Sequence, residues 1–267
     1  MTHLQPIILL IVTLLLFPSA TMAAESAPLG QTWKEPLTGM EFIWIEGGCF
    51  AMGCSSNWST DCDEDEKPSH TVCVDNFYMA KYEVTQAQWR KVTGSNPAYF
   101  KKGDEYPVEK VSWDQSQEFI GLLDQKHQQL RFRLPTEAEW EFACRSGGKQ
   151  ENFCGGNEID ALAWHKKNSQ GLSHPVGQKT PNGLGLYDMS GNVAEWTNDR
   201  YEAQYYANSP DDNPQGPTEP QARADRGGSW LFYPKSARST NRNWYWPDGR
   251  RNFLGLRVLL ELEKQTK

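Results

Sequence analysis

The sequence predicts a single compact domain of helices and strands with little regular structure. Capped helices and strand patterns occur in the first half of the chain, whereas Gly, Pro, Asn and Trp dominate after residue 150. Eleven tryptophans supply a large buried area per residue. From Met40 to Leu262 the composition is even, without linker or repeat, and about 220 residues suffice for one sizeable core.

Two stretches of the first half predict strands. "EFIWIEGG", beginning at Glu41, alternates like a strand that leads into a turn. "TVCVDNFYMAKYEVT", beginning at Thr71, predicts a strand, a turn and a second strand.

Three stretches predict helices with recognisable ends. "TQAQWRKVTG" has Thr85 as its N-cap and a terminal glycine, and "SWDQSQEFIGLLDQKHQQ" is an amphipathic helix capped by Ser112. The third, "LPTEAEWEFACRSGG", is capped by Thr136, carries Glu139 at the capping-box position and ends near Gly147.

The N-terminal segment predicts export. Ile7 to Phe17 is an apolar run that is too short to cross a membrane, and small residues follow it up to Ala23. We therefore interpret residues 1–23 as a signal peptide, 24–39 as a leader and 40–262 as the domain, with no transmembrane helix in the mature protein. An uncleaved membrane anchor is the alternative.

The charge of the chain excludes one class of partner. The net charge is −7 and the isoelectric point is about 5.3. Nucleic-acid binding requires basic patches, so we expect no nucleic-acid partner.

Six cysteines in an exported chain predict disulfides. No CxxC spacing occurs, which argues against zinc. Four cysteines alone allow three pairings, so the sequence does not fix the connectivity. The pairs that the local context favours are Cys49 with Cys73 in strand-like segments, Cys54 with Cys62 around an acidic loop, and Cys144 with Cys154.

The acidic loop "DCDEDEKPSH" has a weak resemblance to a calcium-binding EF-hand loop. Asp61, Asp63 and Asp65 alternate as the first ligands of an EF-hand would. Glu66 stands where that motif needs Gly, and Val72 where it needs Glu. A solvated acidic loop is the better interpretation.

Seven stretches in order resemble one known family. They are "GGCFAMG", "DEKPSHTVCVDNFYMAKYEVTQAQW", "YPVEKVSWDQSQEF", "RLPTEAEWEFACR", "HPVGQKTPNGLGLYDMSGNVAEW", "RGGSW" and "LGLRV". The order is that of formylglycine-generating-enzyme-like (sulfatase-modifying factor) proteins. The resemblance runs from about Met40 to Leu260 and implies a single α+β domain related to C-type lectins, with low regular secondary structure.

The resemblance also implies a calcium site. "DMSGNVAEW" matches the calcium loop of the family, with Asp188, the carbonyls of Gly191 and Val193, and the Glu195 carboxylate as ligands. Ca²⁺ prefers six to eight hard oxygen ligands, and a turning loop can supply them. The alternative is a glycine-stabilised turn with solvated acids. A second site of the family would fall in "WHKKNSQ", where Asn168 is the candidate ligand.

The residues that carry oxidase activity in the family are replaced. Catalytic members hold copper with two cysteines after the "GGS" motif, and Phe232 and Ala237 stand at those positions here. Neither side chain can bind Cu(I), which prefers soft thiolate ligands. We therefore expect no formylglycine-generating activity by that mechanism and predict no catalytic residue.

Two functions remain after this substitution. Exported bacterial members of this kind are similar to accessory proteins of the type VI secretion system, which act in the periplasm upstream of a transmembrane Ser/Thr kinase. The resemblance thus implies a calcium-stabilised, non-catalytic periplasmic protein that binds another envelope protein, such as an outer-membrane lipoprotein or the periplasmic part of a kinase. The alternative is a periplasmic maturation enzyme with a non-cysteine site, similar to the exported member of pyoverdine maturation.

One stretch has the composition of a binding surface. "ARSTNRNWYWPDGRRNF" combines Arg with Trp and Tyr, the residues that dominate binding hot spots. The alternative is that the tryptophans are core and that the arginines pair with Asp225 and Asp248. The predicted partner-binding residues are Arg238, Arg242, Trp244, Tyr245, Trp246, Arg250 and the adjacent Arg251.

Overall fold

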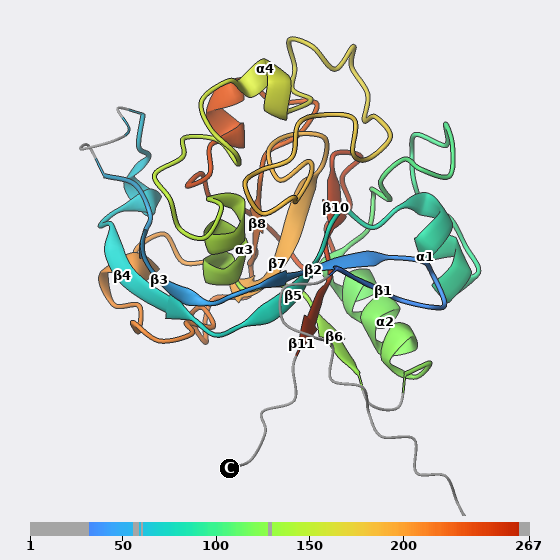
Figure 1. Cartoon of the computed structure of the whole chain (residues 1–267), viewed down its shortest axis with the longest axis horizontal. Helices are drawn as coiled ribbons and strands as arrows, with labels where there is room; N and C mark the ends of the chain where they lie inside the picture. The colour runs from blue at the N-terminus through green and yellow to red at the C-terminus, as the bar shows by residue number, and fades with distance from the viewer. Residues whose placement is uncertain (1–31, 56–58, 60, 128–129, 262–267) are drawn as a thin grey trace, which may run out of the picture.

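A computed structural model describes residues 32–55, 59, 61–127 and 130–261 (Figure 1). The predicted signal peptide, residues 1–23, lies outside the described residues. Within them, no helix has the length and apolar character needed to cross a bilayer.

A five-stranded antiparallel sheet joins the two ends of the domain. Its order is β1–β2–β5–β11–β6. The strands are β1 (Thr32–Lys34), β2 (Glu41–Ile45), β5 (Phe77–Ala80), β6 (Arg131–Arg133) and β11 (Leu259–Glu261). β1 lies within the stretch expected to be a leader, and it pairs with β2 from Thr32 to Lys34.

A second sheet forms in the half that showed no strand pattern. Its order is β10–β7–β8–β9, with β10 and β7 parallel and the other pairs antiparallel. The strands are β7 (Ala194–Arg200), β8 (Arg223–Arg226), β9 (Asn243–Tyr245) and β10 (Leu254–Leu256). A third, two-stranded sheet pairs β3 (Gly48–Met52) with β4 (His70–Val74).

The predicted helices form behind their caps. They are α1 (Gln86–Thr93), α2 (Trp113–Asp124) and α3 (Glu137–Cys144), with a short α4 (Ile159–Leu162). The side chains of Thr85, Ser112 and Thr136 accept N-terminal amide hydrogens, and each helix has a complete capping box. α2 ends at Asp124 and is therefore shorter than the predicted stretch. Short 3-10 turns η1 (Glu64–Glu66), η2 (Tyr205–Ala207) and η3 (Pro234–Ala237) lie in the connections.

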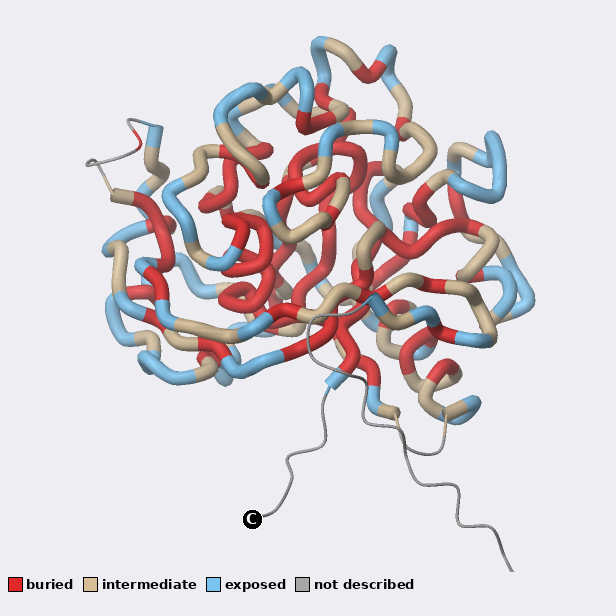
Figure 2. The backbone as a smooth tube through the Cα atoms, viewed as in Figure 1, coloured by how far each residue is buried: buried red, intermediate tan, exposed pale blue. Residues whose placement is uncertain are grey.

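The core extends through the middle of the molecule, where the tube is almost continuously buried (Figure 2). One apolar cluster includes Trp89, Phe119 and Trp196, and a second includes Trp140 and Phe142. Figure 1 shows α1 and α2 on one side of the molecule and the β3–β4 sheet on the other, with irregular segments at the top. Four tryptophans thus lie in the interior between short elements, namely Trp89, Trp140, Trp196 and Trp230, whereas Trp244 and Trp246 are exposed.

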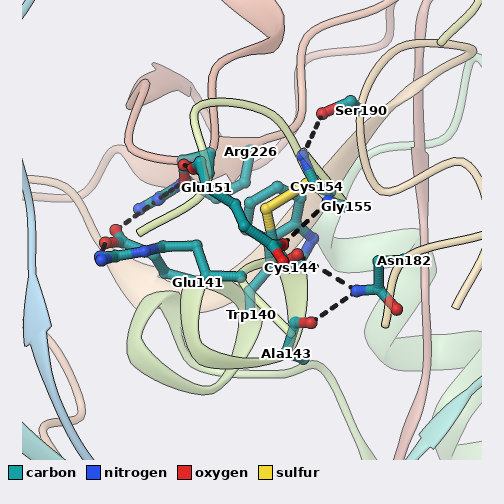
Figure 3. Close-up of a disulfide and its surroundings, with 12 residues drawn as sticks. Trp140, Glu141, Ala143, Cys144, Glu151, Cys154, Gly155, Asn182, Ser190 and Arg226 are labelled. Atoms are coloured by element: carbon teal, nitrogen blue, oxygen red, sulfur yellow. Dashed lines mark hydrogen bonds and ion pairs between the residues drawn. A yellow bond between two sulfur atoms is a disulfide. The ribbon is translucent and has the colours of Figure 1, made fainter. Parts of the chain in front are cut away.

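The three favoured disulfides are confirmed. Cys49 pairs with Cys73, Cys54 with Cys62 and Cys144 with Cys154, and no described cysteine is free. Figure 3 shows the third disulfide beside Trp140. The amide of Cys154 donates to Ser190 Oγ at 3.1 Å, and this hydroxyl donates to the carbonyl oxygen of Ala237 at 2.8 Å. The Ser190 hydroxyl therefore links the predicted calcium loop both to a residue of this disulfide and to η3.

Candidate metal and partner-binding sites

The predicted calcium loop, Asp188–Glu195, is entirely buried. Asp188 adopts a left-handed conformation with φ of 57°. Its Oδ2 accepts a hydrogen bond from Gly177 N at 2.7 Å, whereas its buried Oδ1 has no partner among the described residues. Gly191 is required by packing, because a Cβ there would lie 2.4 Å from the carbonyl oxygen of Trp164. The loop therefore leaves one carboxylate oxygen without the partner that a buried polar atom needs.

Glu195 is held by other side chains. Its Oε1 accepts from Arg257 Nη2 at 2.6 Å, and its Oε2 accepts from Trp140 Nε1 at 2.7 Å. Glu195 and Arg257 are both fully buried. The carboxylate could contribute only its remaining lone pairs to an ion, because these donors already orient it.

A third buried acid, Glu83, lies against the same loop. Its carboxylate accepts from Val193 N at 2.9 Å and from Asn192 Nδ2 at 2.6 Å. Burial raises the pKa of Glu83 well above its ordinary value, and the negative charges of Asp188 and Glu195 raise it further. Burial likewise raises the pKa of Asp188 to about 6. Sequence reasoning missed Glu83 because it lies about a hundred residues from the loop and belongs to no local motif.

A divalent cation at this loop would need backbone carbonyls among its ligands, because Glu83, Asp188 and Glu195 do not form a cluster with side-chain metal-ligand spacing among the described residues. Three buried carboxylates face one buried guanidinium, which leaves an excess of negative charge when all are ionised. Ca²⁺ would supply this missing charge and a partner for Asp188 Oδ1, and it would lower the pKa values of the acids around it. Asp188 would be the principal side-chain ligand, and the role of the ion would be structural.

The candidate for a second site is already engaged. Asn168 Oδ1 accepts from His165 N at 2.8 Å, and its Nδ2 donates to the carbonyl oxygen of Ala163 at 3.0 Å. Among the described residues, the cluster with side-chain metal-ligand spacing is Cys54, Cys62 and Glu66. Because those two cysteines form a disulfide, they offer no thiolate to a metal.

The positions of the family's copper cysteines are apolar. The ring of Phe232 meets that of Phe253 with centroids 4.9 Å apart, and Phe232 packs against the first core cluster. Ala237 is 1% exposed and packs with Phe153 and Leu162. Both positions are therefore apolar and packed against other hydrophobic side chains.

Two of the predicted partner-binding arginines are buried, which corrects that prediction. Arg238 is 2% exposed and donates to both oxygens of Glu66, at 2.7 and 2.6 Å. Arg242 is 5% exposed and donates to both oxygens of Glu137, at 3.0 and 2.8 Å. They therefore support the interior, and their partners are neither Asp225 nor Asp248. The rest of the predicted surface is exposed or half-buried, with Trp244 at 43% and Trp246 at 57%.

The acidic loop is fastened to the domain and is not simply solvated. Glu66 is fully buried in its pair with Arg238. Asp63 accepts from Lys235 Nζ at 2.7 Å, and Asp65 accepts from the Tyr201 hydroxyl at 2.7 Å. These three acids are therefore bound to side chains of the protein. In an EF-hand the acids of the loop would bind Ca²⁺ instead.

Helix α3 is buried and carries the carboxylate that binds Arg242. All eight of its residues are buried, including Glu137, Glu139 and Glu141. Arg226 donates to Glu137 Oε1 at 3.1 Å and to Glu141 Oε2 at 2.7 Å (Figure 3 draws Glu141 and Arg226). Arginines from distant segments thus compensate the carboxylates of α3, as buried charges require.

Asp225 on β8 is a further buried acid. It is 2% exposed, and Asn243 Nδ2 donates to both of its oxygens, at 3.3 and 3.1 Å. Burial raises its pKa to about 7, the charge of Glu137 acts in the same direction, and Asn243 and Arg226 oppose the rise. This carboxyl therefore titrates in the neutral range.

A groove of about 740 Å³ lies away from these sites. It adjoins the Cys49–Cys73 disulfide and contains none of the predicted metal- or partner-binding residues. Its charged lining includes Arg133, which forms a bidentate pair with Glu139 at 2.7 Å for each bond. Among the described residues that line the groove there is no serine, threonine, histidine or lysine, and the two cysteines are joined in a disulfide.

The model of the sulfatase-modifying factor enzyme 1-like domain matches residues 29–262. The chain belongs to this family. The formylglycine-generating enzyme of Streptomyces coelicolor is 33% identical, with 90% of this chain and 94% of the relative covered. Chaperone protein LppX of Paenibacillus barcinonensis is 30% identical, with coverage of 82% and 89%. These likenesses confirm the family that the motifs indicated.

The chain is also similar to part of a kinase and to nearly the whole of PvdO. Serine/threonine-protein kinase Pkn1 of Chlamydia trachomatis serovar L2 is 29% identical, but the match covers 84% of this chain and 38% of the kinase. The solved structure of PvdO from Pseudomonas aeruginosa has a TM-score of 0.78 and 28% identity, with 88% of this chain and 99% of PvdO covered. This structural match confirms the single α+β domain of the sulfatase-modifying factor type.

Proposed function

We propose that this member of the sulfatase-modifying factor family is a non-catalytic, calcium-stabilised binding protein of the bacterial periplasm. Its place would be a type VI secretion pathway that signals through a Ser/Thr kinase. The observation that carries the proposal is the apolar packing of Phe232 and Ala237 at the copper-cysteine positions. All described cysteines are in disulfides, so none can replace the missing thiolates.

The binding role is supported by exposed aromatic side chains on β9 and directly after it. Trp244 stacks on Tyr201 with centroids 6.0 Å apart and meets Trp246 edge-on at 6.2 Å. β9 is an edge strand of the second sheet, so this aromatic cluster lies where another protein can approach. Contiguous exposed aromatic side chains mark interaction sites, and Trp is enriched at the hot spots of interfaces.

The kinase connection is supported by Pkn1, in which a region similar to this chain is part of a kinase. This chain, which belongs to the same family, would instead bind a kinase as a separate protein partner. The pathway itself rests on the resemblance to type VI secretion accessory proteins.

The decisive experiment is a turnover assay. The purified protein is incubated with a sulfatase-type cysteine peptide, copper and oxygen, and the peptide is weighed by mass spectrometry. We expect no conversion of cysteine to formylglycine; conversion would refute the non-catalytic role. For the partner, Trp244→Ala with Trp246→Ala should reduce capture of a purified periplasmic kinase segment at unchanged stability, and unchanged capture would exclude the β9 surface.

A maturation enzyme with a non-cysteine site is the second candidate, and Glu109 favours it. Glu109 is fully buried, its Oε1 accepts from Phe100 N at 2.7 Å, and its Oε2 has no partner among the described residues. Burial raises its pKa to about 7, the range in which a general acid–base group works. A pyoverdine-type precursor should then change mass with the wild type and not with Glu109→Gln. No change with either protein would eliminate this candidate.

A further inference from the structure

Exposed aromatic and cationic side chains surround the apolar pair Phe232–Phe253. On one side, Lys166 N donates to the carbonyl oxygen of Phe232 at 2.9 Å. The Lys166 ammonium lies 4.6 Å from the ring centroid of Tyr233, which is 56% exposed. Lys166 and Tyr233 therefore form one edge of the surface around Phe232.

The other edge begins at Phe253. The ring of Tyr245 meets that of Phe253 at 6.0 Å, and the Arg251 guanidinium lies 5.4 Å from the Tyr245 ring. Lys110 N donates to the carbonyl oxygen of Arg251 at 2.9 Å, and the Lys110 ammonium lies 5.9 Å from Tyr99. Tyr99 is 61% exposed. We call the connected residues the aromatic rim: Tyr99, Lys110, Lys166, Tyr233, Tyr245 and Arg251.

The cations of the rim form no ion pair within the described part of the chain. Lys110, Lys166 and Arg251 are exposed, and none of them forms an ion pair there. By contrast, the buried arginines of this protein bind carboxylates in pairs. A chain with a net charge of −7 thus carries three unpaired cations around one half-buried apolar floor.

We propose that the aromatic rim binds an acidic peptide segment of the protein partner. This inference deepens the proposed function and rests on it. Carboxylates of the segment would pair with Lys110, Lys166 and Arg251, and an apolar side chain between them would cover Phe232. Aromatic residues beside cations supply both contact area and charge for such a segment.

A peptide fits the rim better than a membrane or nucleic acid. Charges separated by more than about 8 Å are largely screened at physiological salt, so a short segment interacts mainly with the local cations. An extended polyanion would also meet the rest of an acidic protein and be repelled. The rim cations alternate with aromatic rings and do not form a continuous basic stripe.

The test compares two charge reversals of equal size. The rim variant carries Lys166→Glu and Arg251→Glu. The control carries Lys126→Glu and Lys149→Glu, which reverse two exposed cations that have no ion pair in the described residues and lie after α2 and α3. The probe is a short fluorescent peptide of Glu residues interrupted by Phe, titrated by anisotropy, with a Lys-for-Glu peptide as the reference.

We expect saturable binding of the acidic peptide that weakens with salt. The rim variant should bind about tenfold more weakly, and the control should stay within about twofold of wild type. Tyr233→Ala, which leaves the charge unchanged, should also weaken binding about threefold. Melting curves show whether each variant is folded, and Tyr233→Ala provides the test if the rim reversal unfolds the chain.

Three results would overturn the inference. They are no saturable binding by wild type, equal losses in the rim and control variants, and tighter rim-dependent binding to phosphatidylglycerol vesicles than to the peptide. The turnover assay on the same preparation separates the two claims. If the acidic peptide does not bind and no turnover occurs, only the proposed role of the rim is rejected. If turnover occurs, the non-catalytic function is rejected.

Discussion

Replacing Arg242 by Ala should destabilise the protein without involving any partner. The Arg242 guanidinium donates two hydrogen bonds to Glu137, and the side chains are 0% and 2% exposed. It also lies 4.1 Å from the Tyr206 ring centroid. The variant would leave the Glu137 carboxylate buried with fewer donors and remove the cation from Tyr206.

The expected magnitude follows from the remaining contacts. Breaking a buried ion pair by removing one partner costs about 3–5 kcal/mol of unfolding free energy. Arg226 Nη1 still donates to Glu137 at 3.1 Å, so we expect the lower end of this range, about 3 kcal/mol. Urea unfolding with the disulfides intact measures the loss. The exposed Arg250→Ala is the control and should change stability by less than about 0.5 kcal/mol.

A loss below about 1 kcal/mol for Arg242→Ala would refute this reasoning, because a truly buried pair cannot be broken so cheaply. If that variant were stable but failed to bind its partner, Arg242 would belong to the binding surface after all. A double-mutant cycle with Glu137→Gln should then show no coupling, whereas the buried pair predicts a clear coupling energy.

Three other measurements follow from the site. Metal analysis should find calcium, chelation should lower the melting temperature, and Asp188→Ala should abolish both effects, since at a hundredfold excess over the dissociation constant a ligand adds about 2.7 kcal/mol; calcium-free protein would contradict this. Thiol titration of the exported protein in denaturant should find no free thiol, and two or more would point to a redox role. Burial raises the pKa of Asp225 from 3.8 to about 7, so the stability that its protonated form gives is complete below pH about 4 and is lost as the pH rises through about 7. Asp225→Asn should therefore flatten this decline of the unfolding free energy with pH, as measured by urea titrations. An equal slope of unfolding free energy against pH in both proteins would exclude Asp225 as the source of the decline.

The first half of the fold was predictable because its signals are local. Thr85, Ser112 and Thr136 each bond to the third residue of their helix, so cap and helix can be recognised within a few residues. The cysteine pairs were also local, with separations of 24, 8 and 10 residues. The family motifs added two predictions that stay predictions, a calcium loop and the loss of the copper cysteines.

The second sheet gave little such signal because several of its buried side chains are polar. β7 reads "AEWTNDR", yet five of its seven residues are buried. Glu195 is neutralised by Arg257, which is 62 residues away. Hydrophobic periodicity detects apolar faces only, so a strand buried through ion pairs escapes it. The stretch around Arg242 has the composition of a binding hot spot, but Arg242 itself is buried in an ion pair with Glu137 of α3. The sequence does not show this distant partner.

The position of β11 has a consequence for how this chain folds and how it tolerates alteration. β11 lies between β5 and β6, and Leu259 pairs with Met79 on one side and with Arg133 on the other. Such distant pairing makes formation of the sheet slow, and it requires almost the whole polypeptide to have emerged first. A chain that ended a dozen residues before Glu261 would lose an interior strand of the sheet rather than a dispensable tail. Tags and fusions are therefore better placed beyond this strand, and a frameshift near the end of the gene would be as damaging as one near its middle.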